Sequence, residues 1–241
     1  MDTTGGTRSP ARGALFWLRA TVRFVIYLLL VPAALFLSAG RLDWVMGWVV
    51  FGVMLCASLL SRALVARLNP DLLRERAAAG EREGVQPWDR WLVPAVALLG
   101  PAAMAVVAGL DQRQGWSAAL PWTVAASGLG LLLLGDALST WAMVSNPFFS
   151  AYVRIQSDRG HVAVSRGPYR WLRHPGYAGA VLADFAVPLA LGSLWAMVPA
   201  VATIALVALR TALEDRTLRA LLPGYREYAQ RVRFRLIPRV W

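Results

Sequence analysis

The sequence predicts an all-α membrane protein, a polytopic helical bundle of about six transmembrane helices that ends in a helical hairpin. Of its 241 residues, 57% are hydrophobic and only 16% are charged, and the mean hydropathy is +0.49. The apolar residues come in runs of roughly 18 to 25, the length that a helix needs to cross about 30 Å of hydrocarbon. Composition and run length together exclude a disordered chain, a collagen-like repeat and an ordinary soluble fold.

The apolar runs place the expected helices in order along the chain. The first run is long and is followed by no small-residue cleavage site, so we expect a retained anchor and not a signal peptide. Gly192 and Ser193 separate the last two runs and form the turn of the hairpin. The six predicted spans are residues 16–37, 43–61, 91–110, 118–144, 177–192 and 195–213.

The arginines predict the orientation in the membrane. With the N-terminus in the cytoplasm, only Arg41 and Arg113 fall in loops on the outer side. This asymmetry follows the positive-inside rule and predicts that both termini are cytoplasmic. It also accounts for the formal net charge of +11, so we expect the lipid bilayer as a partner and no nucleic acid. The absence of lysine is typical of a GC-rich genome, so we expect the inner membrane of a bacterial cell.

The chain divides into three regions. Residues 1–13 are polar and are expected to be a flexible cytoplasmic N-terminus. Residues 14–145 hold four spans and, in the loop 69–89, an Asn-Pro pair that predicts a short cytoplasmic surface helix. Residues 146–241 hold two further spans and the most informative polar motifs. The single cysteine, Cys56, lies inside an apolar run, so we expect no disulfide and no bound metal.

The third region begins with a segment that is too polar to span a membrane and too aromatic and β-branched to be a plain linker. We expect this segment, residues 148–173, at the cytoplasmic interface and partly buried against the bundle. The string Arg-His-Pro-Gly-Tyr then puts Pro175 in the first turn of the fifth helix. The backbone N–H groups of such a helix start favour an anionic group, for example a ligand carboxylate.

A second polar group follows where the sixth helix returns to the cytoplasm. Arg210 and Glu214 are four residues apart and therefore share one face of that helix. A Pro-Gly break then leads to a segment that carries Tyr225 and Tyr228. We expect the two polar groups to face each other across the mouth of the hairpin, bordered by lipid. A pocket of this kind suits a charged cofactor and an apolar substrate.

Three motifs occur in order in the third region: GPYRWLRHPGYAG at 167–179, the pair Glu214-Asp215, and PGYREYAQRVRFRLIP at 223–238. Together they resemble the isoprenylcysteine carboxyl methyltransferase family and its bacterial relatives, and more distantly the phospholipid methyltransferases. The earlier spans match only in hydropathy and in the Asn-Pro-x-Leu-Leu loop. The family usually has Glu-Glu where this chain has Glu214-Asp215. The resemblance implies an integral-membrane methyltransferase that uses S-adenosylmethionine and acts on a lipophilic or prenylated acceptor.

The resemblance implies a role for individual residues. It implies that Arg210 binds the acceptor carboxylate and that Arg210 and His174 take part in catalysis. The chemistry agrees, because an acid, the donors of a helix start and aromatic rings match the ammonium, carboxylate, sulfonium and adenine of the cofactor. The cofactor-binding residues that it implies are Gln156, His161, Val162, Ala163, Val164, Tyr169, His174, Pro175, Gly176, Tyr177 and Glu214.

The acceptor decides whether catalysis needs a base. A carboxylate needs none, so alignment and the exclusion of water would carry the reaction. An amine or thiol would need one, and His174 and Asp215 are the candidates. The alternatives are a phospholipid, amine or thiol methyltransferase and an NADPH-dependent sterol-type membrane reductase; Arg210 four residues before Glu214 favours the carboxyl methyltransferase. A transporter is disfavoured because the polar residues cluster at one interface. The oligomeric state stays open.

Simpler structural roles compete with these assignments. His174 can cap a helix, and Arg210 can belong to an ion pair at the interface. Tyr228 is expected in the aromatic belt at the membrane surface. Asp136 and Asp184 lie within predicted spans, where an acid is costly and marks a functional site or the partner of an inward polar group. The resemblance assigns a role to neither.

Overall fold

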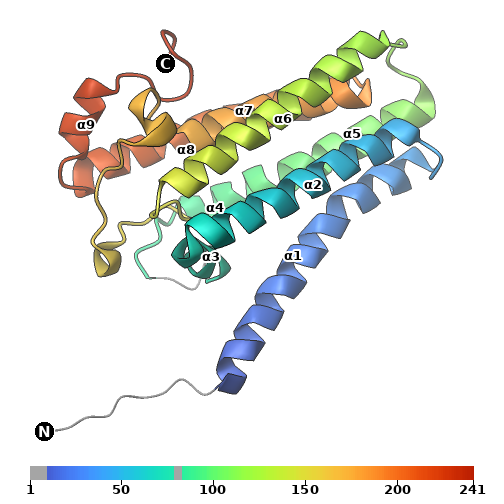
Figure 1. Cartoon of the computed structure of the whole chain (residues 1–241). Helices are drawn as coiled ribbons and strands as arrows, with labels where there is room; N and C mark the ends of the chain where they lie inside the picture. The colour runs from blue at the N-terminus through green and yellow to red at the C-terminus, as the bar shows by residue number, and fades with distance from the viewer. Residues whose placement is uncertain (1–9, 79–82) are drawn as a thin grey trace, which may run out of the picture.

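The computed structural model describes residues 10–78 and 83–241, and this part of the chain contains helices and no strand. The predicted all-α class is therefore confirmed. The long helices run alongside one another, with the first half of α1 diverging from the rest (Figure 1). The longer helices are α1 (Pro10–Ala39), α2 (Val45–Leu68), α5 (Gly100–Gln114), α6 (Trp122–Ser145), α7 (Pro175–Leu191) and α8 (Met197–Leu221). The shorter helices are α3 (Pro70–Ala77), α4 (Asp89–Pro94), η1 (Ala95–Leu99), η2 (Ser157–Arg159), η3 (Gly167–Arg170) and α9 (Tyr225–Arg231).

Four helical segments are long and apolar enough to cross a membrane: α2, the continuous run Asp89–Gln114, α6 and α8. Two shorter apolar helices accompany them, Phe24–Ala39 within α1 and α7. The six predicted spans fall on these six segments. A polytopic helical membrane protein is therefore confirmed.

The third predicted span is less regular than the sequence suggested. It consists of α4, the π-helical turn η1 and α5, joined without a break. Pro94 and Pro101 flank the π-helical turn, and proline has no backbone N–H to donate to the preceding turn. Prolines and π-turns are the usual causes of a local change in a long helix. Asp89, in the first turn of α4, is fully buried.

Glycine residues allow α6 and α7 to pack closely. A Cβ at Gly135 of α6 would lie 2.6 Å from the carbonyl oxygen of Gly179 on α7, and one at Gly128 would lie 2.5 Å from the backbone nitrogen of Ala190. Small residues at such positions let two helix backbones approach in a membrane. This close contact fixes the start of α7 relative to the end of α6.

The hairpin between α7 and α8 turns at the predicted residues. Gly192 adopts a left-handed conformation (φ 71°) at the end of α7, where glycine carries no steric cost. Ser193 donates its hydroxyl to Asp111 Oδ2 at 2.5 Å. Ser117 donates its backbone N–H at 2.7 Å and its hydroxyl at 2.6 Å to the same carboxylate. Asp111 therefore ties the end of α5 to the turn of the hairpin.

The other end of the bundle carries the short helices and most of the charged residues. We call it the polar end and define it as α3, residues 146–174 and residues 222–241; Figure 1 shows it around α9 and α3. The surface helix predicted after Asn69 is α3, with Pro70 at its first position. The Asn69 amide does not cap α3. It donates to the carbonyl oxygens of Met143 and Asn146, both at 3.1 Å, and so ties α3 to the end of α6.

The segment after α6 is partly buried, as the sequence predicted. Gln156 and Pro168 are almost completely buried, whereas Arg166 and Trp171 are exposed. The backbone N–H groups of Arg173 and His174 donate to the carbonyl oxygens of Phe234 and Arg235 at 2.9 and 3.0 Å. The C-terminal tail therefore holds the residues that lead into α7.

Most of the predicted N-terminal arm, residues 1–13, lies outside the described residues. Helix α1 begins at Pro10, so residues 10–13 are helical and the boundary predicted after residue 13 was too late. Proline is favoured at the first helical position because its missing N–H would have no partner there.

Candidate active site

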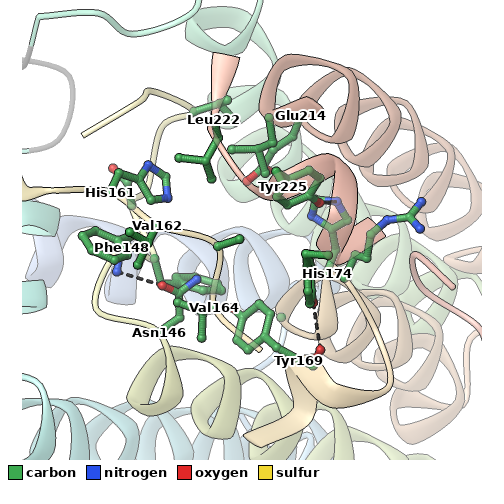
Figure 2. Close-up of a pocket in the computed structure, with 18 of the residues that line it drawn as sticks. Asn146, Phe148, His161, Val162, Val164, Tyr169, His174, Glu214, Leu222 and Tyr225 are labelled. Atoms are coloured by element: carbon green, nitrogen blue, oxygen red, sulfur yellow. Dashed lines mark hydrogen bonds between the residues drawn. The ribbon is translucent and has the colours of Figure 1, made fainter. Parts of the chain in front are cut away.

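An open cavity lies at the polar end of the bundle, lined by side chains from three parts of the chain. In Figure 2, labelled side chains from residues 146–164, from residues 169–174 and from residues 214–225 surround one space. The hairpin of α7 and α8 connects the second part to the third and brings both to the same side of the bundle. The cavity is the candidate active site.

Most of the predicted cofactor residues share this cavity. Gln156, Pro175 and Arg210 lie close to it but outside its wall. The predicted residues that line it are His161, Val162, Ala163, Val164, Tyr169, His174, Gly176, Tyr177 and Glu214.

The start of α7 forms one side of the cavity. His174 is the residue before the helix, Pro175 is at its first position, and the His174 side chain makes no capping hydrogen bond. The His174 ring instead stacks on Tyr177, with ring planes 7° apart and centroids at 5.8 Å. A Cβ at Gly176 would collide with the ring of Phe149, which also lines the cavity. Glycine at position 176 therefore lets the Phe149 ring pack against the start of α7.

Tyr177 and Glu214 join the two helices of the hairpin. The Tyr177 hydroxyl donates to Glu214 Oε2 at 2.5 Å. On its other side, the Tyr177 ring lies 5.0 Å from the guanidinium carbon of Arg210. The two polar groups predicted from the sequence therefore face each other across the hairpin.

Arg210 has an acidic partner that the sequence did not reveal. Its Nε and Nη2 donate to the two oxygens of Asp89 at 2.6 and 2.9 Å, and Nη2 also donates to the Ala151 carbonyl at 2.8 Å. Asp89 is fully buried and also accepts from the backbone N–H of Val153 at 2.6 Å. The bidentate face with which Arg210 was expected to hold an acceptor carboxylate is therefore occupied by Asp89.

Asp215 is the centre of a buried ionic network. It is 1% exposed and accepts from Arg173 Nε at 2.7 Å, Arg235 Nε at 3.0 Å and the Tyr225 hydroxyl at 3.1 Å. His174 Nε2 lies 3.5 Å from the same carboxylate. Burial and the nearby carboxylate raise the pKa of Tyr225, so its hydroxyl stays protonated as a donor. Asp215 therefore holds the start of α7, α8 and the C-terminal tail in place.

Gln156 supports the cavity from behind. Its side chain is fully buried, its Nε2 donates to the Phe148 carbonyl at 2.7 Å, and its Oε1 accepts from Arg159 Nη1 at 2.6 Å. Its backbone N–H donates to Nδ1 of His161 at 3.3 Å. The side-chain amide is thus used within the protein, where it fixes Phe148, and the backbone N–H of the same residue fixes His161.

The segment 161–164 presents an open backbone edge to the cavity. The backbone groups of residues 162–164 make no hydrogen bond within residues 10–78 and 83–241. The His161 ring packs on Phe148 with centroids 4.6 Å apart. Burial and the positive charges of Arg154 and Arg159 lower the pKa of His161 to about 4, so the ring is neutral at physiological pH. The edge can donate to and accept from a flat polar ligand such as a nucleobase.

The prediction that Tyr228 belongs to an aromatic belt is wrong. Tyr228 is 2% exposed and packs beside Tyr225, with ring centroids 5.5 Å apart. Its hydroxyl donates to the Tyr169 carbonyl at 2.8 Å. Burial raises the pKa of Tyr228, which keeps this donor protonated. Helix α9 therefore turns its tyrosines inward as part of the cavity wall.

The cavity wall holds groups that suit an organic cofactor. Among the described residues, no three His, Cys, Asp or Glu side chains are grouped as metal ligands would be. Glu214 offers a carboxylate, the segment 161–164 a polar backbone edge, and Tyr169, Tyr225 and Leu222 apolar surface. This set can bind a molecule that has both cationic and aromatic parts.

Comparison with known proteins finds a family model that covers most of the cavity wall. The model described as the isoprenylcysteine carboxyl methyltransferase (ICMT) family matches residues 128–220. This range contains every predicted cofactor residue and Arg210, whereas Asp89, Tyr225 and Tyr228 lie outside it. The resemblance seen in the sequence is therefore confirmed.

Curated relatives from two plants match parts of the chain. A probable protein-S-isoprenylcysteine O-methyltransferase of Oryza sativa subsp. indica is 32% identical over 62 residues, which are 25% of this chain and 32% of that protein. Protein-S-isoprenylcysteine O-methyltransferase B of Arabidopsis thaliana is 29% identical over 114 residues, which are 46% of this chain and 58% of that protein. The matches thus span about a third to somewhat more than half of these relatives.

Proposed function

We propose that this chain, whose residues 128–220 match the isoprenylcysteine carboxyl methyltransferase family, is an integral-membrane methyltransferase that uses S-adenosylmethionine. Its acceptor is the carboxylate of an isoprenylcysteine-like or other lipophilic molecule. One observation carries the proposal: Glu214, Tyr177 and the segment 161–164 converge on one cavity from three parts of the matched range. The cavity lies at the end of apolar helices, so a lipophilic tail can stay in the bilayer while its head reaches the site.

The residues of the cavity fit the groups of S-adenosylmethionine. Tyr177 uses Oε2 of Glu214, and Oε1 makes no hydrogen bond in the described part of the chain, so it can accept from an ammonium or a ribose hydroxyl. The open backbone edge of residues 162–164 can pair with the adenine. Tyr169 and Leu222 supply apolar surface beside it. Opposite charge and matched hydrogen bonds favour this molecule over an apolar ligand of the same size.

The protein's share of the reaction is positioning. When bound, S-adenosylmethionine would supply a methyl group carried by a sulfonium. The acceptor carboxylate would take this methyl group and the neutral sulfide would leave, so the reaction needs no general base. Tyr177 holds Glu214 in place, and Asp89 holds Arg210 beside Tyr177. Fixed groups of this kind contribute through alignment and exclusion of water. His174 acts as a positioning residue, because its Nε2 faces Asp215 and the Tyr225 hydroxyl at 3.5 and 3.4 Å.

The polar end faces the cytoplasm in this proposal. On the opposite side, the loops carry only Arg41 and Arg113 among the arginines of the chain, and the positive-inside rule places such loops outside. A cytoplasmic site would draw its methyl donor from the cytoplasm and its acceptor from the inner leaflet. The absence of lysine, which is typical of a GC-rich genome, makes the bacterial inner membrane the expected location.

The test is calorimetric binding of S-adenosylmethionine and, separately, NADPH to the protein in detergent. Glu214→Gln removes the acid that faces the cavity, so the affinity for S-adenosylmethionine should fall about tenfold or more. Glu227→Gln is the matched control, because Glu227 is an exposed acid on α9 outside the cavity wall. It should leave the affinity unchanged.

Three results would contradict the proposal. Binding of NADPH without S-adenosylmethionine would favour the sterol-type reductase. Binding of neither would remove both enzymatic functions. Binding of S-adenosylmethionine that is equally strong in the Glu214 variant would place the cofactor in another part of the molecule.

A further inference from the structure

The guanidinium of Arg76 at the polar end has no acidic partner in the described part of the chain. Arg76, near the end of α3, is half-buried, and its guanidinium carbon lies 5.6 Å from the ring centroid of Phe149, which lines the cavity. Burial and the positive charges of Arg62 and Arg210 lower the pKa of Arg76 to about 10. It is still a cation at neutral pH, and its partial desolvation is not offset by a carboxylate among residues 10–78 and 83–241.

Helix α3 is fixed against the cavity, so Arg76 is held in one place. Asn69, before α3, donates to the carbonyl of Asn146, a cavity residue, at 3.1 Å. Glu75, next to Arg76, is 2% exposed and accepts from Nε of Arg154, also a cavity residue, at 2.9 Å. These contacts on both ends of a short helix hold the Arg76 backbone beside the cavity.

Three other arginines around the cavity are neutralised by buried acids. Arg154, Arg173 and Arg210 each form an ion pair with a carboxylate that is at most 2% exposed. Asp89 engages Nε and Nη2 of Arg210, and Nη1 makes no hydrogen bond within the described residues.

Arg159, over the ring of Phe148 at 5.7 Å, also has no acidic partner in the described part of the chain, but its Nη1 donates to Gln156. Arg76 therefore keeps a positive charge without a counter-charge, and Arg210 keeps a free donor edge.

The guanidinium of Arg76 lies beside the candidate active-site cavity and is not part of its wall. Arg76 lies over the ring of Phe149, and Arg210 lies over the ring of Tyr177 at 5.0 Å. Both rings line the cavity, whereas neither arginine does. A carboxylate between the two arginines would thus be next to the bound methyl donor, separated from the segment that would hold its adenine.

We propose that Arg76 and the Nη1 edge of Arg210 bind the carboxylate of the methyl acceptor. This inference rests on the proposed function and adds a substrate-binding residue from α3, outside the range that matches the family. A carboxylate here supplies the counter-charge that Arg76 lacks. Methyl transfer forms the O–CH₃ bond of the ester and breaks the S–CH₃ bond of the donor, leaving a neutral sulfide. The ester has no charge for Arg76, which favours release of the product.

The test compares N-acetyl-S-farnesylcysteine with its methyl ester, by calorimetric binding to the full chain in lipid nanodiscs. The wild type should bind the acid about tenfold or more tightly than the ester, because only the acid makes the charge-assisted contact. Arg76→Gln should abolish this preference, and Arg76→Lys should keep part of it. In turnover, Arg76→Gln should raise KM for the acid more than it lowers kcat.

Arg74→Gln is the matched control on the same helix. Arg74 is exposed, with 72% of its side chain accessible, and it lies 3.6 Å from Asp71 at the surface. This variant loses a positive charge of α3 without changing the cavity, so it should keep the preference for the acid. It also separates a local effect of Arg76 from a general effect of net charge.

Three outcomes would overturn the inference. The first is a wild type that binds the ester as tightly as the acid, or binds neither. The second is an unchanged preference in Arg76→Gln. The third is a loss of S-adenosylmethionine affinity in Arg76→Gln without a change for the acid, which would assign Arg76 to the carboxylate of the methyl donor. Failure of the wild type to bind S-adenosylmethionine is a separate result and bears on the proposed function.

Discussion

Each end of the bundle holds a buried acid, but the two ends satisfy it in different ways. At the hairpin turn, Asp111 accepts from the hydroxyls of Ser117 and Ser193 and from one backbone N–H. At the polar end, Asp215 pairs with Arg173 and Arg235 and accepts from a tyrosine hydroxyl. Neutral donors close a turn, whereas paired charges from distant segments build the wall of a cavity.

The difference shows which end is arranged for a ligand. In the cluster around Asp111, both carboxylate oxygens accept hydrogen bonds from groups of the protein, which are the Ser117 backbone and the hydroxyls of Ser117 and Ser193. The polar end has ion pairs that hold it together and, beside them, groups that remain available: Oε1 of Glu214, the backbone of residues 162–164 and the guanidinium of Arg76. A site built for binding differs from a structural cluster by these remaining groups.

The largest expected effect is that of Asp215→Asn. The change leaves two buried or partly buried arginines, Arg173 and Arg235, without their counter-charge. Breaking a buried ion pair costs about 3–5 kcal/mol, so the thermal unfolding midpoint of the detergent-solubilised protein should fall sharply and cofactor binding should be lost. Asp71→Asn, at a surface position, is the control and should leave the midpoint unchanged. An Asp215 variant as stable as the control would contradict the role of the ionic network.

A smaller effect is expected for Asp111→Asn at the other end. The carboxylate there accepts from hydroxyl and backbone donors only, so the loss should be about 1–2 kcal/mol of unfolding free energy. The affinity for S-adenosylmethionine should stay at the wild-type value, because Asp111 is far from the cavity wall along α5. Calorimetry on the same preparation measures both quantities. A tenfold loss of affinity in this variant would show that the two ends do not act independently.

The smallest effect concerns pH. The folded protein lowers the pKa of His161 to about 4, below the value of about 6.5 that an unfolded histidine has. Between these values the unfolded state binds a proton that the folded state does not, so stability is full above about pH 6.5 and falls toward pH 4. Thermal unfolding at pH 7 and pH 5 should therefore show a larger decrease for the wild type than for His161→Gln. Equal decreases in the two proteins would show that His161 is not buried in its neutral form.

The helices could be predicted because their signals are local. Apolar runs, the Pro-initiated helices at Pro70 and Pro175, and the glycine at 192 depend on residues that are adjacent in the chain. The π-helical turn after Pro94 was not predicted, because the sequence of an apolar run does not say how a proline inside it is accommodated. The apolar run also does not show how far a helix extends beyond it into polar residues. The start of α1 at Pro10 therefore lies before the position expected from the sequence.

The partners within the site could not be predicted, because they come from distant parts of the chain. Asp89 and Arg210 are 121 residues apart and meet only because the start of α4 and the C-terminal part of α8 lie at the same side of the bundle. Tyr228 lies among arginines in a C-terminal tail, where a tyrosine pattern alone is typical of a membrane surface. From the sequence, Asp215 was expected only as a base for an amine or thiol acceptor. Its network could not be predicted, because Arg173 and Arg235 lie 42 and 20 residues away along the chain.

The most direct test of the central claim is methyl transfer itself. The purified full chain in lipid nanodiscs is incubated with S-adenosylmethionine labelled in its methyl group and with N-acetyl-S-farnesylcysteine, and base-labile label is measured in the lipophilic product. We expect a methyl ester to form with the wild type, and to be lost with Glu214→Gln but not with Glu227→Gln. Binding of the cofactor without formation of any ester would contradict a carboxyl methyltransferase.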